Sequence, residues 1–288
     1  MPAAIWALAI ATFGIGTTEF VIAGLLPGIA TEFGISFSEA GYMATSYALG
    51  VFVGAPLLII LGARVRQKTM LVSLMGELSA FVDVHVLLAM GITVLAPAAF
   101  FTAITYISPM MTELTGYSNN GVTGILFLFG LGLFIGNLLG GKLADCALMP
   151  LLYVTLAGQA LVLFAFFFVV ESRVASAICV LLMAGFGFAS VSPIQRLVMD
   201  KARAAGAPNL AAPVNIGLFN LGNAIGAWLG GWVIALGFGF AAPQLGGWHS
   251  LDVRFAAGHR LGLAHGHSWG QTKSGNGLCG ELSDARSA

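Results

Sequence analysis

The hydrophobic residues of this chain fall in long runs, separated by short segments that hold most of the charged residues. A helix that crosses a bilayer needs about 20 mainly apolar residues. Seven runs reach this length, near residues 4–26, 40–61, 84–110, 121–143, 150–170, 174–199 and 213–240. We expect Pro27 to end the first of them, because proline removes a helix hydrogen bond. The pattern predicts an all-α, polytopic membrane protein.

An eighth apolar run, residues 69–82, is harder to place. Its roughly 14 residues would make about 21 Å of helix, which is too short for a hydrocarbon core of about 30 Å. The sequence therefore predicts about seven to eight transmembrane segments. We favour seven full spans, with residues 69–82 forming a stub or joining the helix that follows.

Basic residues predict the orientation, because Lys and Arg accumulate in cytoplasmic loops. The densest basic cluster, residues 62–68, follows the second run. Placing it in the cytoplasm puts the N-terminus there as well, and puts the linker with Glu32 and Glu39 outside. If residues 69–82 add no crossing, the later basic loops also face the cytoplasm; they contain Lys142, Lys201 and Arg203.

Composition excludes several classes of protein. The chain is 58% hydrophobic and 8% charged, with a mean hydropathy of +0.93, so it cannot cover itself with charge as a soluble domain does. Its net charge of zero gives no reason to expect a nucleic-acid partner. No phosphate-binding loop, metal-ligand spacing or nucleophile–base set is visible, which predicts no ATP-driven motor, no metal or other cofactor, and no enzyme activity.

Glu19 is the strongest candidate for function, because it lies near the middle of the first apolar run. A charge at that depth costs a few kcal/mol on insertion scales, so it is rare without a use. A protonated Glu19 is nearly neutral, whereas an ionised one needs a cation, water or a hydrogen-bond donor. It is therefore a candidate proton or cation site. The alternative is a protonated carboxyl that bonds to Thr17 or Thr18 and only helps packing.

Polar and small residues recur on one face of the last run. Asn215 and Asn223 fall with three glycines within an arc of about 100°. Such a stripe avoids lipid, so it either bonds to another helix or lines a cavity. Glycines four residues apart, here and at residues 132–140, predict close helix packing. For Gln159 and Gln195 we favour hydrogen bonds between helices.

Three stretches resemble the major facilitator superfamily: residues 16–27, the loop that begins Gly62-Ala-Arg-Val, and residues 215–231. Within that family they are most similar to the drug/proton antiporter branch, the sugar-efflux and chloramphenicol-resistance permeases. The resemblance covers roughly residues 5–242. It implies a multi-pass protein of the inner membrane that exports small organic molecules, drugs or sugars, in exchange for protons, with no cofactor beyond the proton gradient.

The resemblance also implies roles for individual residues. Glu19 would couple transport to protons. The residues that would line a substrate cavity are Tyr47, Tyr106, Gln195, Asn215 and Asn223.

The family's loop motif implies gating roles for Arg64, Lys68 and Asp145. Ala63 stands where the first copy of this motif has an aspartate, which favours a simple topology role for Arg64 and Lys68.

The chain also departs from the family pattern of twelve helices in two halves. The runs near residues 4–26, 40–61 and 69–82 resemble family helices 1, 2 and part of 3. The five later runs resemble helices 7 to 11, so helices 4–6 and 12 have no counterpart. We therefore expect a partial N-terminal bundle at residues 1–82, a C-terminal bundle at 83–242, and a polar, disordered tail at 243–288.

Two other functions stay open at this point. The shortened chain could be a remnant that does not transport. It could also be a membrane interaction or scaffold protein that acts through its glycine faces. A homo-oligomer is one way to shelter polar stripes that the missing helices would otherwise cover.

Overall fold

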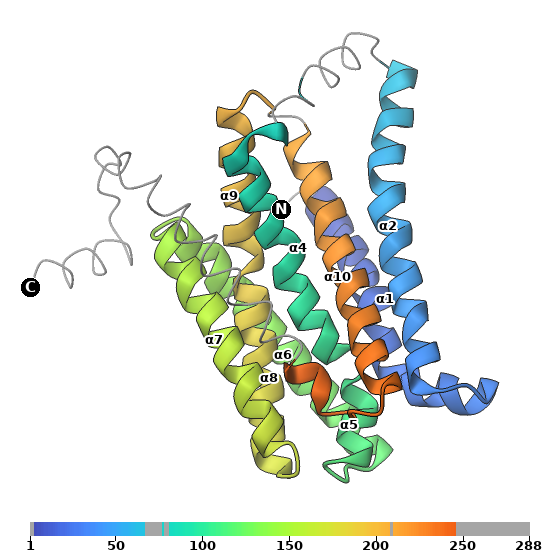
Figure 1. Ribbon diagram of the computed structural model, residues 1–288. Helices are drawn as coiled ribbons and strands as arrows, with labels where there is room; N and C mark the ends of the chain where they lie inside the picture. The colour runs from blue at the N-terminus through green and yellow to red at the C-terminus, as the bar shows by residue number, and fades with distance from the viewer. Residues whose placement is uncertain (1–2, 67–76, 78–80, 208–209, 246–288) are drawn as a thin grey trace, which may run out of the picture.

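The protein is a bundle of long helices (Figure 1). The computed structural model describes residues 3–66, 77, 81–207 and 210–245. The helices are α1 (Ala3–Phe33), α2 (Phe37–Arg66), α4 (Val84–Ile104), α5 (Ile107–Glu113), α6 (Asn119–Ala144), α7 (Leu148–Val169), α8 (Arg173–Ala189), α9 (Val191–Ala204) and α10 (Ala211–Ala235). No strand occurs in these parts of the chain, which confirms the all-α prediction.

Most of these helices are built to cross a membrane. Within the described parts of the chain, five helical stretches are long and apolar enough by length and composition: Val84–Glu113, Asn119–Ala144, Leu148–Val169, Arg173–Ala204 and Ala211–Ala235. The first two helices, α1 and α2, are longer than most of them, at 31 and 30 residues. At about 1.5 Å per residue, each exceeds the hydrocarbon thickness of a bilayer.

The spans alternate in direction along the chain, with α4 and α5 forming one span and α8 and α9 another. In Figure 1, α2 ends and α4 begins at the same end of the bundle, the top of the view. Our prediction for residues 69–82 falls mostly outside the described residues. The helices α6 and α9 also end at this face, and α10 begins there.

Pro27 does not end the first helix, contrary to our expectation. The helix continues through it to Phe33. Proline leaves one backbone carbonyl without its usual donor, but membrane helices tolerate this when neighbouring groups compensate. The next helix begins with a capping box, in which Glu39 Oε2 accepts from the Ser36 backbone N–H at 2.8 Å and the Ser36 hydroxyl accepts from the Glu39 N–H at 3.2 Å.

Two spans are each divided into two helices by a short break. The first interruption separates α4 from α5 at Thr105 and Tyr106. The second separates α8 from α9 at Ser190, three residues before Pro193. The Ser190 hydroxyl donates to the Gly187 carbonyl at 2.6 Å, so the break is hydrogen-bonded within the protein.

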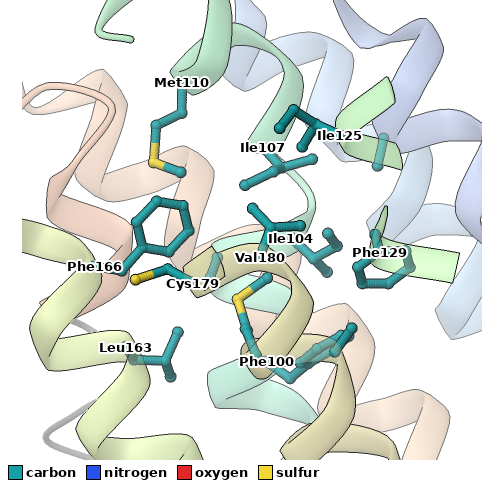
Figure 2. Close-up of a cluster of buried hydrophobic side chains, with 14 of the residues drawn as sticks. Phe100, Ile104, Ile107, Met110, Ile125, Phe129, Leu163, Phe166, Cys179 and Val180 are labelled. Atoms are coloured by element: carbon teal, nitrogen blue, oxygen red, sulfur yellow. The ribbon is translucent and has the colours of Figure 1, made fainter. Parts of the chain in front are cut away.

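The main apolar core lies among α4, α5, α6, α7 and α8 (Figure 2). Its members include Phe100, Ile104, Ile107, Met110, Ile125, Phe129, Leu163, Phe166, Cys179 and Val180. Aromatic rings fill its centre, with Phe100 and Phe129 stacked at 6.0 Å between centroids. This core fixes α6 and α8, which bear part of the site described below.

Glycine stripes bring two pairs of helices into backbone contact, as the four-residue spacing predicted. On α6, Gly132, Gly136 and Gly140 face the backbone of α8, and a Cβ at any of them would overlap a carbonyl oxygen there. On α10, Gly222, Gly226 and Gly230 face the backbone of α4 in the same way.

The helix α2 packs onto the rest of the bundle against α10, which lies between α4 and α2 (Figure 1), whereas α1 packs against α2, α5 and α6. Leu26, Ala30 and Ala40 form a small second core with Tyr106. Because Gly41 of α2 and Gly231 of α10 have no side chain, the Tyr106 ring fits between these helices.

Candidate functional site

A cavity of about 750 Å³ lies between α1 and α6. Its lining residues are Gly16, Glu19, Phe20, Val21 and Ala23 of α1; Leu126, Phe129, Gly130, Leu133, Phe134 and Asn137 of α6; Ile104 of α4; and Phe188 of α8. Phe134 is 65% exposed, so the cavity opens at the outer face of α6. Its volume is in the range of small-molecule binding sites, about 300–1,000 Å³.

The lining is aromatic and apolar apart from two side chains. Glu19 alone among the described lining residues can carry a charge, and Asn137 is the other polar one. Phe20 packs against Phe129 and Phe188, with ring centroids 5.4 and 5.6 Å apart. The cavity therefore offers a large apolar contact area and one ionisable group.

Glu19 is held by a neighbouring helix. Asn223 of α10 donates from Nδ2 to Glu19 Oε1 at 2.9 Å, across 204 residues of sequence. Asn223 is only 1% exposed, and its Oδ1 has no hydrogen-bond partner among the described residues. The structure thus brings together two of the residues that the sequence singled out.

The other predicted cavity residues lie elsewhere. Asn215 accepts a hydrogen bond from the Thr93 hydroxyl of α4 at 2.8 Å, which is a contact between helices. Tyr106 is buried in the second core and donates to the Ala227 carbonyl at 3.0 Å. Tyr47 of α2 and Gln195 of α9 are half-buried, and neither is in the lining.

The predicted gating residues are divided between described and undescribed parts. Asp145 caps the C-terminal end of α6 and forms an ion pair with Arg196 of α9. Arg196 also donates to the Ala144 carbonyl at 3.4 Å. Arg64 lies within α2, in a stretch whose side chains are not described, and Lys68 lies outside the described residues.

Sequence reasoning missed two parts of this site. The first is the aromatic lining: phenylalanines in apolar runs look like any lipid-facing or core residue, and only the position of Phe20 beside Glu19 gave a signal. The second is Arg196, the partner of Asp145. Its position in a run otherwise poor in charge was the available clue.

Comparison with known proteins gives consistent results. The family model described as Major Facilitator Superfamily matches residues 8–82. The inner membrane transport protein YdhP of Escherichia coli K12 is 29% identical, over 83% of this chain and 91% of that protein. The putative transporter AraJ of the same organism is 24% identical, over 83% and 90%. A chloramphenicol resistance protein of Streptomyces lividans is 38% identical over 85 residues, which are 30% of this chain and 21% of that protein.

The alignment with YdhP also shows an internal difference in length. It runs over 356 positions, but 83% of the 288 residues is only about 239 residues of this chain. More than 100 positions therefore have no residue here. That length is enough for three spans of about 20 residues with their loops, in agreement with the predicted absence of family helices 4–6.

Proposed function

We propose that this chain is a member of the major facilitator superfamily and that it exports small, mainly apolar organic molecules in exchange for protons. Membership makes it a membrane transporter rather than an enzyme. The observation that carries the finer proposal is the position of Glu19. It is the one charge-bearing group among the described residues of an apolar cavity, and a buried amide donates to it.

The cavity supports a simple exchange. The carboxylate of an ionised Glu19 can bind either a proton or a cationic substrate. Binding either one neutralises a charge that is otherwise uncompensated in an apolar site. Proton and substrate would therefore compete for the same carboxylate. Transport then follows when the cavity opens alternately to the two sides of the membrane.

The lining favours an apolar substrate over a sugar. A sugar carries many hydroxyl groups, and each needs a hydrogen-bond partner when it leaves water. Among its described lining residues, the cavity offers only the polar side chains of Glu19 and Asn137, against a wall that includes Phe20, Phe129 and Phe188. The similar protein from Streptomyces lividans is a chloramphenicol resistance protein, and chloramphenicol contains an aromatic ring, as this lining would favour.

We place the protein in the inner membrane with its N-terminus in the cytoplasm. The last turns of α6 and α9 carry Lys142, Lys201 and Arg203, and both helices end at the face where α2 ends. The positive-inside rule assigns this face to the cytoplasm. The pair of Asp145 and Arg196 lies at the same face, so we propose that it is part of a cytoplasmic gate.

Transport in everted membrane vesicles tests the proposal. Uptake of chloramphenicol and of ethidium, an apolar cation, is measured with and without a pH gradient. We expect Glu19→Gln to abolish gradient-driven uptake. Glu39→Gln makes the same chemical change at an exposed helix start and keeps the capping box, so it serves as the matched control. Gradient-driven uptake that persists in Glu19→Gln would contradict the proposal.

A second candidate function is a membrane protein that does not transport. The observation that favours it is the exposed opening of the cavity at α6, together with the shortened alignment. In that case the chain would act by associating with a second copy or with a full-length relative. Two results would support this alternative. Vesicles that contain the chain would take up neither probe, and the unmodified chain and Glu19→Gln would change the transport of a full-length relative to the same extent.

A further inference from the structure

Asn223 offers more than one hydrogen bond to the site. We infer that it is a positioning residue for Glu19 in both of that residue's protonation states, through rotation of its amide by about 180°. The inference rests on the proton-coupled transport proposed above. It means that the orientation of the Asn223 amide on α10 changes when Glu19 gains or loses its proton.

The chemistry of the two side chains fits this role. An ionised carboxylate only accepts hydrogen bonds, and a protonated one gains an O–H donor. In the structure, Asn223 Nδ2 donates to Glu19 Oε1 at 2.9 Å, which suits the ionised form. Asn223 Oδ1 is buried and has no partner among the described residues. After rotation, this oxygen could accept from protonated Glu19, so one amide can serve both forms.

The helix that carries Asn223 is firmly held. Gly222 and Gly226, on either side of it, press α10 against the backbone of α4. About two turns before Asn223, Asn215 bonds to Thr93, and about one turn after it, the Ala227 carbonyl accepts from Tyr106. Because α10 has this support, a change in the Glu19–Asn223 contact would fall mainly on α1, which carries Glu19.

No other titratable group among the described residues competes for Glu19 in the cavity. The lining contributed by α4, α6 and α8 is apolar except for the Asn137 amide, and Glu19 is the one polar side chain that α1 adds to the described lining. The helices α2 and α5 contribute no described residue to the lining. The polar environment of Glu19 is therefore set mainly by Asn223.

Labelling of Glu19 with dicyclohexylcarbodiimide tests the inference, because this apolar reagent reacts with protonated carboxyl groups. The fraction of Glu19 modified is measured by mass spectrometry over a range of pH on the full chain in detergent. For Asn223→Ala we expect the midpoint pH to rise by roughly half to one unit. The reason is that the lost hydrogen bond to the charged form is stronger than the one to the neutral form.

Asn215→Ala is the matched control, since it removes a buried amide from the same helix but not from Glu19. It should leave the midpoint pH unchanged even if it lowers stability. Infrared difference spectra test the rotation itself. Protonation of Glu19 should move the Asn223 amide carbonyl band to lower frequency, and the shift should be absent in Glu19→Gln.

Three results would overturn the inference: an unchanged midpoint in Asn223→Ala, an equal shift in Asn215→Ala, or an amide band that does not respond to pH. These outcomes are separate from those of the transport proposal. Loss of uptake in Glu19→Gln with an unmoved Asn223→Ala midpoint refutes only the role of Asn223. A shifted midpoint with uptake independent of Glu19 refutes only the transport mechanism.

Discussion

The contact between α10 and α4 gives a sharp prediction for the substitution Gly226→Ala. A Cβ at this position would overlap the Ala98 carbonyl oxygen and lie 2.9 Å from its carbonyl carbon and 3.0 Å from its Cα. All three are backbone atoms of a helix, so no rotamer change can relieve the overlap. The two helices must therefore separate, which loosens the neighbouring contacts at Gly222 and Gly230 as well. Overpacking of this kind costs about 1–3 kcal/mol.

Gly91→Ala on α4 is the matched control, because a Cβ placed there meets no atom within 4 Å beyond its chain neighbours and the nearby backbone of its own helix. In a helix interior, alanine is favoured over glycine by roughly 0.5–1 kcal/mol, so this variant should be neutral or slightly stabilised. A cost of 1 kcal/mol lowers the Tm of a large domain by about 2–4 °C. We therefore expect the Tm of Gly226→Ala to fall by several degrees.

Thermal unfolding in detergent checks this prediction. Trp228 and Trp232 stack on α10 with ring centroids 6.0 Å apart, so their fluorescence reports on this helix. An unchanged Tm for Gly226→Ala, or an equal loss in Gly91→Ala, would refute the argument from close backbone contact.

Two further predictions concern the ends of helices. Arg173 donates from Nη2 to the Gly116 carbonyl at 2.6 Å and closes the turn after α5. In unfolding experiments, Arg173→Ala should lower the free energy of unfolding by about 1 kcal/mol, and Arg173→Lys should recover less than half of that loss. Full recovery in Arg173→Lys would show that the shape of the guanidinium is not needed. Asp83 caps α4, and hydrogen bonds from the backbone N–H groups of His85 and Val86 lower its pKa. Its stabilising effect is therefore present at neutral pH and is lost as the pH falls through that lowered pKa. The Tm deficit of Asp83→Ala should shrink below about pH 4, while a deficit that is constant with pH would contradict the role of the charged cap.

The sequence predicted the spans well and the cavity poorly, for physical reasons. The run near residues 121–143 became α6 at Asn119–Ala144, because the length of an apolar run is set by the bilayer. The prediction that Pro27 ends the first helix was wrong, because the chain is apolar on both sides of the proline and the helix continues through it. Glu19 could be found because a charge in hydrocarbon is costly wherever the rest of the fold lies.

Residues on one stripe received different neighbours. Asn215 and Asn223 are two turns apart on α10, and the sequence treats them alike. In the structure, one bonds to Thr93 of α4 and the other to Glu19 of α1. Which helix faces which turn of α10 depends on the packing of the whole bundle, and no pattern within a single helix records it.

The shared end of α2 and α4 has a consequence for how such a chain could change in length. Because α2 ends and α4 begins on the same side of the membrane, each later loop has a fixed side. An insertion or deletion of an even number of crossings at this join would leave every later loop in its original compartment, whereas an odd number would turn the downstream half inside out. The join between residues 66 and 84 is thus a position where evolution or an engineer can add or remove pairs of helices without rewriting the charges of the remaining loops.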